Sequence, residues 1–419
     1  MIKFIHTADI HFGMENYGRI DPTTGIHTRL LDFHKALSFC IDTALQEQVD
    51  FFLFCGDAYK TAHPSPTQQK LLMESFLRLQ EAHIPIVIIV GNHDHPLSFG
   101  RAHSLDLFGQ IPLKGFHVIS KPRIINLETK NGTVQIVGIP WPTRTNVATN
   151  TIHAHKSSEQ ITDYISQAVA NIIKDYAMQL NPTIPSVLAG HLTVSSGIFS
   201  GSEKRAIYGT DPVLLPSQLA IKPFDYVALG HLHRHQNLNP NGYPAIIYSG
   251  SIERIDFGER KEEKGFCIVS IEEKNKTYYR FVKTPIRPFI QMEIHLQANS
   301  DQTKQIIKHI EQYAIESAVV KIIYHVPADQ PDTVDIKALL QACSSAMYVA
   351  AIVPVRPIIT RARRTGLQTT TTFEQLLASY FNNKPEFTEQ KQAIIDRAQE
   401  LYELAQQQQD TINETLEDI

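Results

Sequence analysis

The chain reads Ile86-Val87-Ile88-Ile89-Val90-Gly91-Asn92-His93-Asp94 near the end of its first hundred residues. The run of β-branched residues predicts a short buried strand, and the glycine after it predicts a turn at the carboxyl end of that strand. Three side chains that can bind metal ions or protons come directly after the glycine. This pattern is typical of an α/β sheet, in which ligands collect at the carboxyl edge of the strands.

Four other short motifs repeat this arrangement within residues 1–233, and each follows or ends a predicted strand. The motifs are Asp9-Ile10-His11, Gly56-Asp57, Gly190-His191 and Gly230-His231-Leu232-His233. Amphipathic helical patterns over residues 30–48 and 67–82 separate the early strands. We therefore predict a mixed α/β sheet in which all five motifs meet at one edge.

The side chains of these motifs suit a centre of two divalent metal ions. Two cations about 3.5–4 Å apart can neutralise a phosphodiester, deprotonate a water and hold it in line for attack. A pair that close needs a bridging carboxylate, and Asp57 is the natural candidate. Asp9 and His11 can both face one ion if the backbone kinks just past the strand. His231 and His233 stand in the same relation to each other.

The ligand types also indicate which metal binds and which residues handle protons. Carboxylates, imidazoles and the neutral amide oxygen of Asn92, without any thiolate, suit Mn²⁺, with Fe²⁺ or Zn²⁺ as alternatives. His93 could protonate the leaving oxygen, and we expect Asp94 to orient its ring. Among the other histidines, only His95 lies close enough to His93 to reach a phosphate. We assign Trp141 to the core rather than to a base-stacking platform.

The composition describes a globular chain of more than one domain. The 419 residues are too many for one ordinary core, and 42% of them are hydrophobic and 20% charged. The longest apolar run, Ile84–Val90, is too short to span a membrane, and we expect no signal peptide because the first motif begins at residue 9. The four cysteines lie far apart in apolar segments, so we expect a soluble protein of the reducing cytoplasm.

Four segments are predicted along the chain. They are a catalytic domain over 1–284, a small α+β domain over 285–355, a basic linker over 356–372 and a helical tail over 373–419. We interpret the basic stretch Arg356–Arg364 as solvated charge, with a contact to a DNA backbone as the alternative. The tail carries two amphipathic stripes, and their periodicity leaves open whether they fold back on the chain or bind a partner. A net charge of −4 leaves nucleic-acid binding open as well.

The five motifs together resemble the calcineurin-like metallophosphoesterase superfamily. Longer stretches are similar to one of its families, SbcD, the nuclease subunits of SbcCD DNA-repair complexes. The resemblance is strong over residues 1–285 and rests on domain order over 286–355. The stretches that carry it are Pro64–Pro66, His191–Ser195, Phe224–His233, Ser249–Glu259 and Glu263–Phe266.

The resemblance implies a fold, a reaction and partners. The fold is a two-sheet sandwich flanked by helices, with a small capping domain that helps to set DNA access and with C-terminal helices. The reaction is manganese-dependent cleavage of DNA, as an exonuclease on duplex ends and an endonuclease on single strands and hairpins. The C-terminal helices would bind SbcC, an ATPase of the SMC type, and two nuclease subunits would pair as a homodimer within a heterotetramer.

The resemblance also implies which residues hold two Mn²⁺ ions. His93 would assist the departure of the leaving group. One ion would be bound by Asp9, His11, Asp57 and His233, and the other by Asp57, Asn92, His191 and His231.

One position departs from the family pattern. Many relatives carry His or Asp three residues after the aspartate of the Gly-Asp motif, where this chain has Lys60. A protonated lysine cannot bind a metal ion but could bind a DNA phosphate.

Two other hypotheses compete with a DNA nuclease. A small-molecule phosphodiesterase or phosphatase could use the same scaffold, although small substrates need neither the capping domain nor the tail. A non-catalytic scaffold with a relic site is disfavoured because every expected ligand position is filled.

Overall fold

The computed structural model describes residues 1–95, 102–110, 114–143, 157–201, 211–328, 330–356, 372–382 and 390–417. The chain forms two compact units, residues 1–355 and 356–419. None of the helices in the described ranges has the length and apolar content that crossing a membrane requires.

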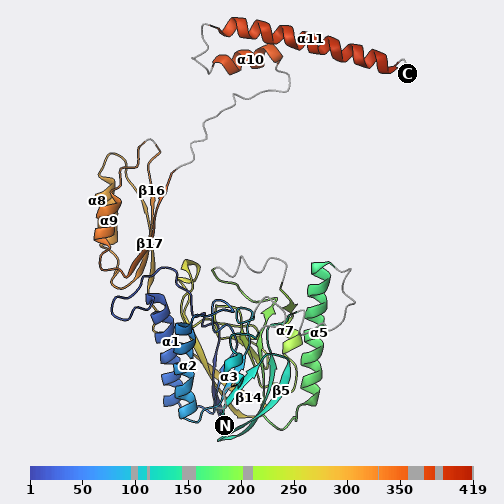
Figure 1. Cartoon of the computed structure of the whole chain (residues 1–419), viewed down its shortest axis with the longest axis vertical. Coiled ribbons are helices and arrows are strands. Elements are labelled where there is room, and N and C mark those ends of the chain that lie inside the picture. Colours follow the sequence, from blue (N-terminus) through green and yellow to red (C-terminus); the bar gives the residue numbers. More distant parts are fainter. Residues whose placement is uncertain are drawn as a thin grey trace. The chain divides into compact units, whose positions relative to one another are not determined.

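Two six-stranded sheets form the body of the first unit (Figure 1). One sheet has the order β14-β13-β1-β2-β3-β4 and the other the order β11-β12-β10-β7-β6-β5. The first contains β1 (Ile2–Thr7), β2 (Phe51–Phe54), β3 (Ile86–Ile89), β4 (Phe116–Ile119), β13 (Gly265–Glu273) and β14 (Lys276–Lys283). The second contains β5 (Arg123–Thr129), β6 (Gly132–Ile139), β7 (Ser186–His191), β10 (Tyr226–Gly230), β11 (Gln236–Asn237) and β12 (Ala245–Tyr248).

The central strands are parallel and buried on both faces, which explains why they read as continuous apolar runs. Their inner side chains form one core between the sheets, where the rings of Phe4 and Phe51 stack with centroids 4.5 Å apart. Helices α1 (Thr28–Gln46) and α2 (Pro66–Glu81) cover the outer face of the first sheet, and α5 (Ser158–Gln179) covers that of the second. The two-sheet sandwich flanked by helices is thereby confirmed.

Local sequence sets where these helices begin. Ser65 and Gln68 form a reciprocal capping box at the start of α2, and Pro66 occupies the first helical turn. Ser157 and Gln160 form the same box at the start of α5. Smaller elements are α3 (Asp106–Gln110), β8 (Thr193–Val194), β9 (Val213–Leu214), α7 (Pro216–Leu219) and a 3₁₀ turn at Phe257–Glu259.

A three-stranded parallel sheet follows the sandwich. It contains β15 (Phe289–His295), β16 (Val319–His325) and β17 (Tyr348–Val355), in that order, together with α8 (Gln302–Ile310) and α9 (Ile336–Ala342). These elements share a core of their own. The strands and helices expected for a small α+β domain are therefore present. Their limits as a separate domain stay a prediction, because these residues belong to the same compact unit as the sandwich.

The second unit contains α10 (Phe373–Asn382) and α11 (Lys391–Glu417). The two helices pack on each other, with the rings of Phe373 and Tyr402 stacked 4.5 Å apart. The predicted basic linker, with the stretch Arg356–Arg364, lies outside the described residues except for its ends. The four cysteines, Cys40, Cys55, Cys267 and Cys343, are free and buried.

Candidate metal centre

The motif residues follow strands whose carboxyl ends meet at one edge of the sandwich. Asp9, His11 and Asp57 adopt left-handed backbone angles, with φ of 54°, 50° and 59°, and His231 has a φ of 105°. Residues other than glycine rarely adopt such angles, and they persist where the surrounding structure enforces them, often at functional sites. The backbone kink that Asp9 and His11 require to face one ion is therefore present.

Two glycines allow the strand ends to approach one another closely. A Cβ atom on Gly91 would lie 2.2 Å from Asp57 Oδ1, and a Cβ atom on Gly230 would lie 2.0 Å from the Cys55 carbonyl oxygen. Both distances are far inside van der Waals contact. Only glycine therefore fits at these two positions of the motifs.

Asp57 occupies the middle of the centre. Its Oδ1 accepts the backbone N–H of His93 at 2.9 Å. Its Oδ2 lies 3.6 Å from His11 Nε2 on one side and 3.4 Å from His191 Nε2 on the other. One carboxylate oxygen thus faces imidazoles from two different groups, which is the arrangement that a bridging ligand needs.

The first group lies on the His11 side of Asp57. The ligand atoms of Asp9, His11 and His233 all lie within 4.8 Å of one another, and these side chains are buried. The Nε2 atoms of His11 and His233 face each other at 3.0 Å. Two imidazoles and a carboxylate at this spacing form a typical divalent-metal site.

The second group lies on the His191 side. Asn92 Oδ1 lies 2.9 Å from His191 Nε2 and 3.2 Å from His231 Nδ1. Asp57 completes this group through its Oδ2. The structure thus brings together all seven residues expected to bind metal, in two groups that share Asp57.

Three imidazoles of the two groups make an outer contact through their second nitrogen. The Nδ1–H of His191 donates to the Cys55 carbonyl at 2.7 Å, and His233 Nδ1 lies 2.9 Å from the buried carboxylate of Glu259. Asp211 Oδ2 lies 3.5 Å from His231 Nε2, which is ion-pair range but not a hydrogen bond. Such outer contacts fix the tautomer and orientation of metal-binding histidines. Sequence reasoning missed Glu259 and Asp211, because no regular spacing links either one to its histidine.

Burial and the neighbouring charges shift the pKa values of the candidate ligands. Burial raises the pKa of Asp9 to about 7, and the same burial lowers the pKa of His11 well below its ordinary value. Burial alone would also raise the pKa of Asp57, but the neighbouring His191 imidazole holds that pKa well below its ordinary value. Burial alone would lower the pKa of His191, but Asp57 raises it to about 9, so in the ion-free centre this imidazole carries the positive charge. Divalent cations bind the neutral imidazole and the ionised carboxylate, and they would replace that proton. The residues present therefore fit a pair of metal ions.

The structure corrects the expected role of Asp94, which does not orient His93. Its buried Oδ2 accepts the backbone N–H groups of Asp57 and Gly91 at 3.0 and 3.1 Å, and its Oδ1 accepts that of Ala58 at 3.1 Å. The carboxylate therefore joins two motif loops to each other. Sequence alone did not show where these amides point.

The main chain of Lys60 holds His93 instead. The Nδ1–H of His93 donates to the Lys60 carbonyl at 2.8 Å, and the exposed ring lies edge-on to that of His11 with centroids 5.0 Å apart. His93 also falls within 4.8 Å of the ligand atoms of His11 and Asp57, so its position suits either a proton donor or a ligand.

Trp141 and His95 are the two remaining ring side chains that the sequence singled out near the centre. Trp141 is not a core residue: it is half-buried, with its ring 4.8 Å from that of His231. His95 lies outside both ligand groups, with its ring 5.8 Å from that of His103.

Comparison with known proteins identifies the family of the chain. The family model for calcineurin-like phosphoesterases matches residues 2–235, which include all seven candidate ligands and His93. The chain belongs to this family. It is therefore a metal-dependent phosphoesterase, and the divalent ions of such enzymes would be bound by the two ligand groups described above.

Relatives of this phosphoesterase include the D subunits of the nuclease SbcCD from two staphylococci. That of Staphylococcus epidermidis is 29% identical over 297 residues, which cover 70% of this chain and 72% of that one. That of Staphylococcus saprophyticus is 29% identical over 316 residues, covering 74% and 77%. A dimetal phosphatase from Danio rerio aligns with 68% of this chain and 99% of its own at a TM-score of 0.41 and 10% identity, too distant for its two metals to be transferred.

We expect Asp94→Ala to lower the free energy of unfolding by at least ~3 kcal/mol, because four buried N–H groups, those of Asp57, Ala58, Tyr59 and Gly91, lose their acceptor at about 1–3 kcal/mol each. Urea denaturation in EDTA measures the change. Asp21→Ala is a matched control, since this solvent-accessible carboxylate also accepts two backbone N–H groups, at 2.8 and 3.0 Å, but at the surface. Equal unfolding midpoints for the wild type and Asp94→Ala would contradict the role assigned to Asp94.

Proposed function

We propose that the chain is a manganese-dependent DNA nuclease, the catalytic subunit of an SbcCD-type complex that processes double-strand breaks. Its substrates are duplex ends, for exonucleolytic cleavage, and single strands and hairpins, for endonucleolytic cleavage. The position of Asp57 Oδ2 between His11 and His191 carries the proposal of a two-metal centre. The similarity to two SbcCD nuclease subunits over about 70% of the chain supports the choice of substrate.

Seven residues of the chain would bind the two metal ions. Asp9, His11 and His233 would hold one Mn²⁺, and Asn92, His191 and His231 the other, with Asp57 shared. When bound, the two ions would neutralise the phosphate and lower the pKa of a water. Carboxylate, imidazole and amide ligands favour Mn²⁺, with Fe²⁺ and Zn²⁺ as alternatives.

His93 serves as the general acid in this proposal. Because its Nδ1–H donates to the Lys60 carbonyl, the ring presents Nε2 as the atom that can pass a proton. Its exposed position beside His11 leaves it accessible to a bound phosphodiester. In the imidazolium form, Nε2 would protonate the departing 3′- or 5′-oxygen, which is a poor leaving group without that proton.

The proposal is tested by incubating the purified chain with Mn²⁺ and end-labelled linear duplex and hairpin DNA, beside a cyclic nucleotide and a phosphomonoester. We expect the DNA to be cut and the small esters to survive, and we expect Asp57→Ala to abolish cleavage. Rapid turnover of the small esters with intact DNA would overturn the choice of substrate. It would indicate a small-molecule phosphodiesterase or phosphatase on the same centre.

We expect His93→Ala to bind two Mn²⁺ ions with unchanged affinity while cleaving DNA about 100- to 10,000-fold more slowly, the usual contribution of a general acid. Calorimetry measures the affinity and gel assays measure the rate. His83→Ala, at a surface position outside the ligand groups, is the control. Loss of one ion from His93→Ala would instead show that His93 is a ligand.

We also propose domain limits and partners. Residues 1–284 form the catalytic domain and 285–355 the capping domain, and the helices of 373–419 bind an SbcC-type ATPase, with two nuclease subunits paired in the complex. The helix pair supports docking because large apolar side chains remain exposed on it. These include Tyr380 at 60%, Leu401 at 52% and Leu404 at 49% exposure.

Deletion of residues 365–419 is expected to abolish association with the SbcC-type ATPase and to preserve the intrinsic nuclease activity. The double substitution Leu401→Glu and Leu404→Glu should have the same effect on association, because it places charge on the exposed apolar side chains. Glu403→Gln, between them on the same helix, is the matched control. Co-purification measures the association, and an unchanged yield of complex after the deletion would refute the docking role.

A further inference from the structure

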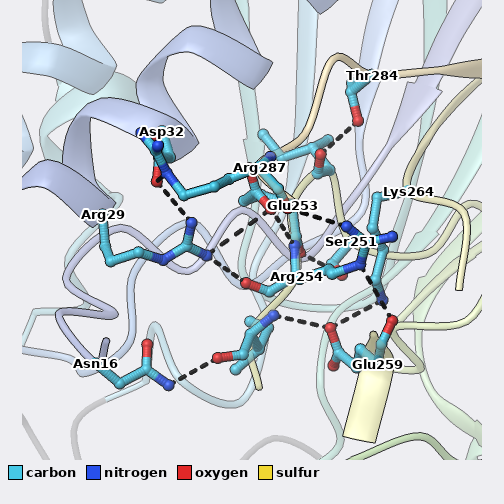
Figure 2. Close-up of polar contacts among 12 residues, drawn as sticks. Asn16, Arg29, Asp32, Ser251, Glu253, Arg254, Glu259, Lys264, Thr284 and Arg287 are labelled. Carbon is cyan, nitrogen blue, oxygen red and sulfur yellow. Dashed lines mark hydrogen bonds and ion pairs between the residues drawn. The ribbon is translucent and has the colours of Figure 1, made fainter. Parts of the chain in front are cut away.

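The segment 251–264, between β12 and β13, carries an unusual amount of buried charge. Glu253, Glu259 and Lys264 are each at most 1% exposed. Figure 2 shows these side chains converging with Arg254 and with Arg29 of α1. Buried charges are costly unless they are paired and hydrogen-bonded, so this arrangement constrains the positions of the residues that it joins.

The metal-ligand candidate His233 is held by this segment at two points. Glu259 Oε1 lies 2.9 Å from His233 Nδ1, and the Lys264 ammonium donates to the His233 carbonyl at 2.9 Å. Lys264 and Glu259 also form an ion pair at 2.9 Å. Burial alone would raise the pKa of Glu259, but Lys264 and His233 lower it to about 2, so the carboxylate is ionised. Ring and backbone of His233 are thus fixed together.

Arg254 connects this pair to the rest of the chain. Its guanidinium donates to three carbonyl oxygens, those of Glu259 at 3.3 Å, Glu262 at 3.2 Å and Arg287 at 3.0 Å. The first two lie in segment 251–264. The third lies two residues before β15, where the chain enters the three-stranded sheet. The planar guanidinium of Arg254 therefore joins segment 251–264 to the residue that precedes the three-stranded sheet.

Arg287 binds both helix α1 and the three-stranded sheet. Its Nε donates to Asp32 Oδ2 of α1 at 2.7 Å, and its guanidinium also donates to the Ser317 carbonyl at 2.6 Å, two residues before β16. On the other side, Arg29 of α1 donates to the Arg254 carbonyl at 2.6 Å (Figure 2). The base of the three-stranded sheet is thereby bonded, through Arg254, to the residue that orients His233.

We propose that Arg254 is a positioning residue that couples the metal ligand His233 to the base of the three-stranded sheet at Arg287. The proposal rests on the two-metal centre proposed above and deepens it. Displacement of this sheet shifts Arg254 and Glu259 and thereby loosens the site that contains His233. The second site shares Asp57 with the first. Among the described residues it makes no contact with Arg254 or Glu259, and the Nδ1–H of His191 donates to the Cys55 carbonyl instead.

The test compares Mn²⁺ binding to the full chain and to Arg254→Gln, by calorimetry with a two-site analysis. We expect one site to weaken about tenfold or more, as is usual when an outer contact of a metal-binding histidine is lost, and the other to keep its affinity. With two Mn²⁺ added per protein, electron paramagnetic resonance should show a coupled pair of ions in the wild type. In the variant it should show isolated ions, because the weakened site is partly empty. Arg260→Gln is the control, since the guanidinium of Arg260 donates to the Phe257 carbonyl within the same segment.

The outcomes separate the coupling from the centre itself. Wild-type protein that binds fewer than two ions would refute the two-metal centre. Two ions bound equally well by wild type and Arg254→Gln would refute the coupling alone, as would equal weakening of both sites, which indicates a general loss of structure. If Arg254→Gln does not fold, Arg287→Ala replaces it, because this change removes the anchors at Asp32 and Ser317 and leaves the carbonyl that Arg254 binds. The same loss at one site is expected there, and its absence overturns the proposal.

Discussion

The centre depends on one buried carboxylate oxygen that faces two sets of ligands. Asp57 Oδ2 lies between His11 and His191, while Asp57 Oδ1 is occupied by the backbone of His93. The carboxylate cannot turn without losing that hydrogen bond, so its free oxygen keeps its place. His11 follows a strand of the first sheet and His191 ends a strand of the second, so this oxygen lies where the motifs of the two sheets meet.

The sandwich supplies the rigidity that such a meeting point needs. Strands β1, β2 and β3 lie side by side in one sheet, and β7 and β10 in the other, with an apolar core between them. Asp94 then binds the two first-sheet loops to each other, and Glu259 and Lys264 hold His233. Each ligand group is thus supported by a buried ionisable side chain that does not itself face the ions.

The sequence predicted the features that depend on residues close together along the chain. Apolar runs predicted the strands, and the glycines after them predicted the turns that carry the candidate ligands. The structure brings all seven of these residues together, and their role as ligands stays a prediction. The role of Asp94 was wrong because the partners of a carboxylate depend on where backbone amides point. Glu259 lies 26 residues after His233, and only the fold brings them together. Trp141 was misplaced for a related reason, since a proline-flanked aromatic gives no sign of which ring it will face.

The left-handed backbone at Asp9, His11 and Asp57 has a consequence for how metal enters. Conformations of this kind cost about 1–3 kcal/mol each, and the sandwich bears that cost during folding. An arriving ion therefore meets ligands that are already arranged and does not have to order a loop. Metal exchange at the proposed centre would then need no rearrangement of these three residues.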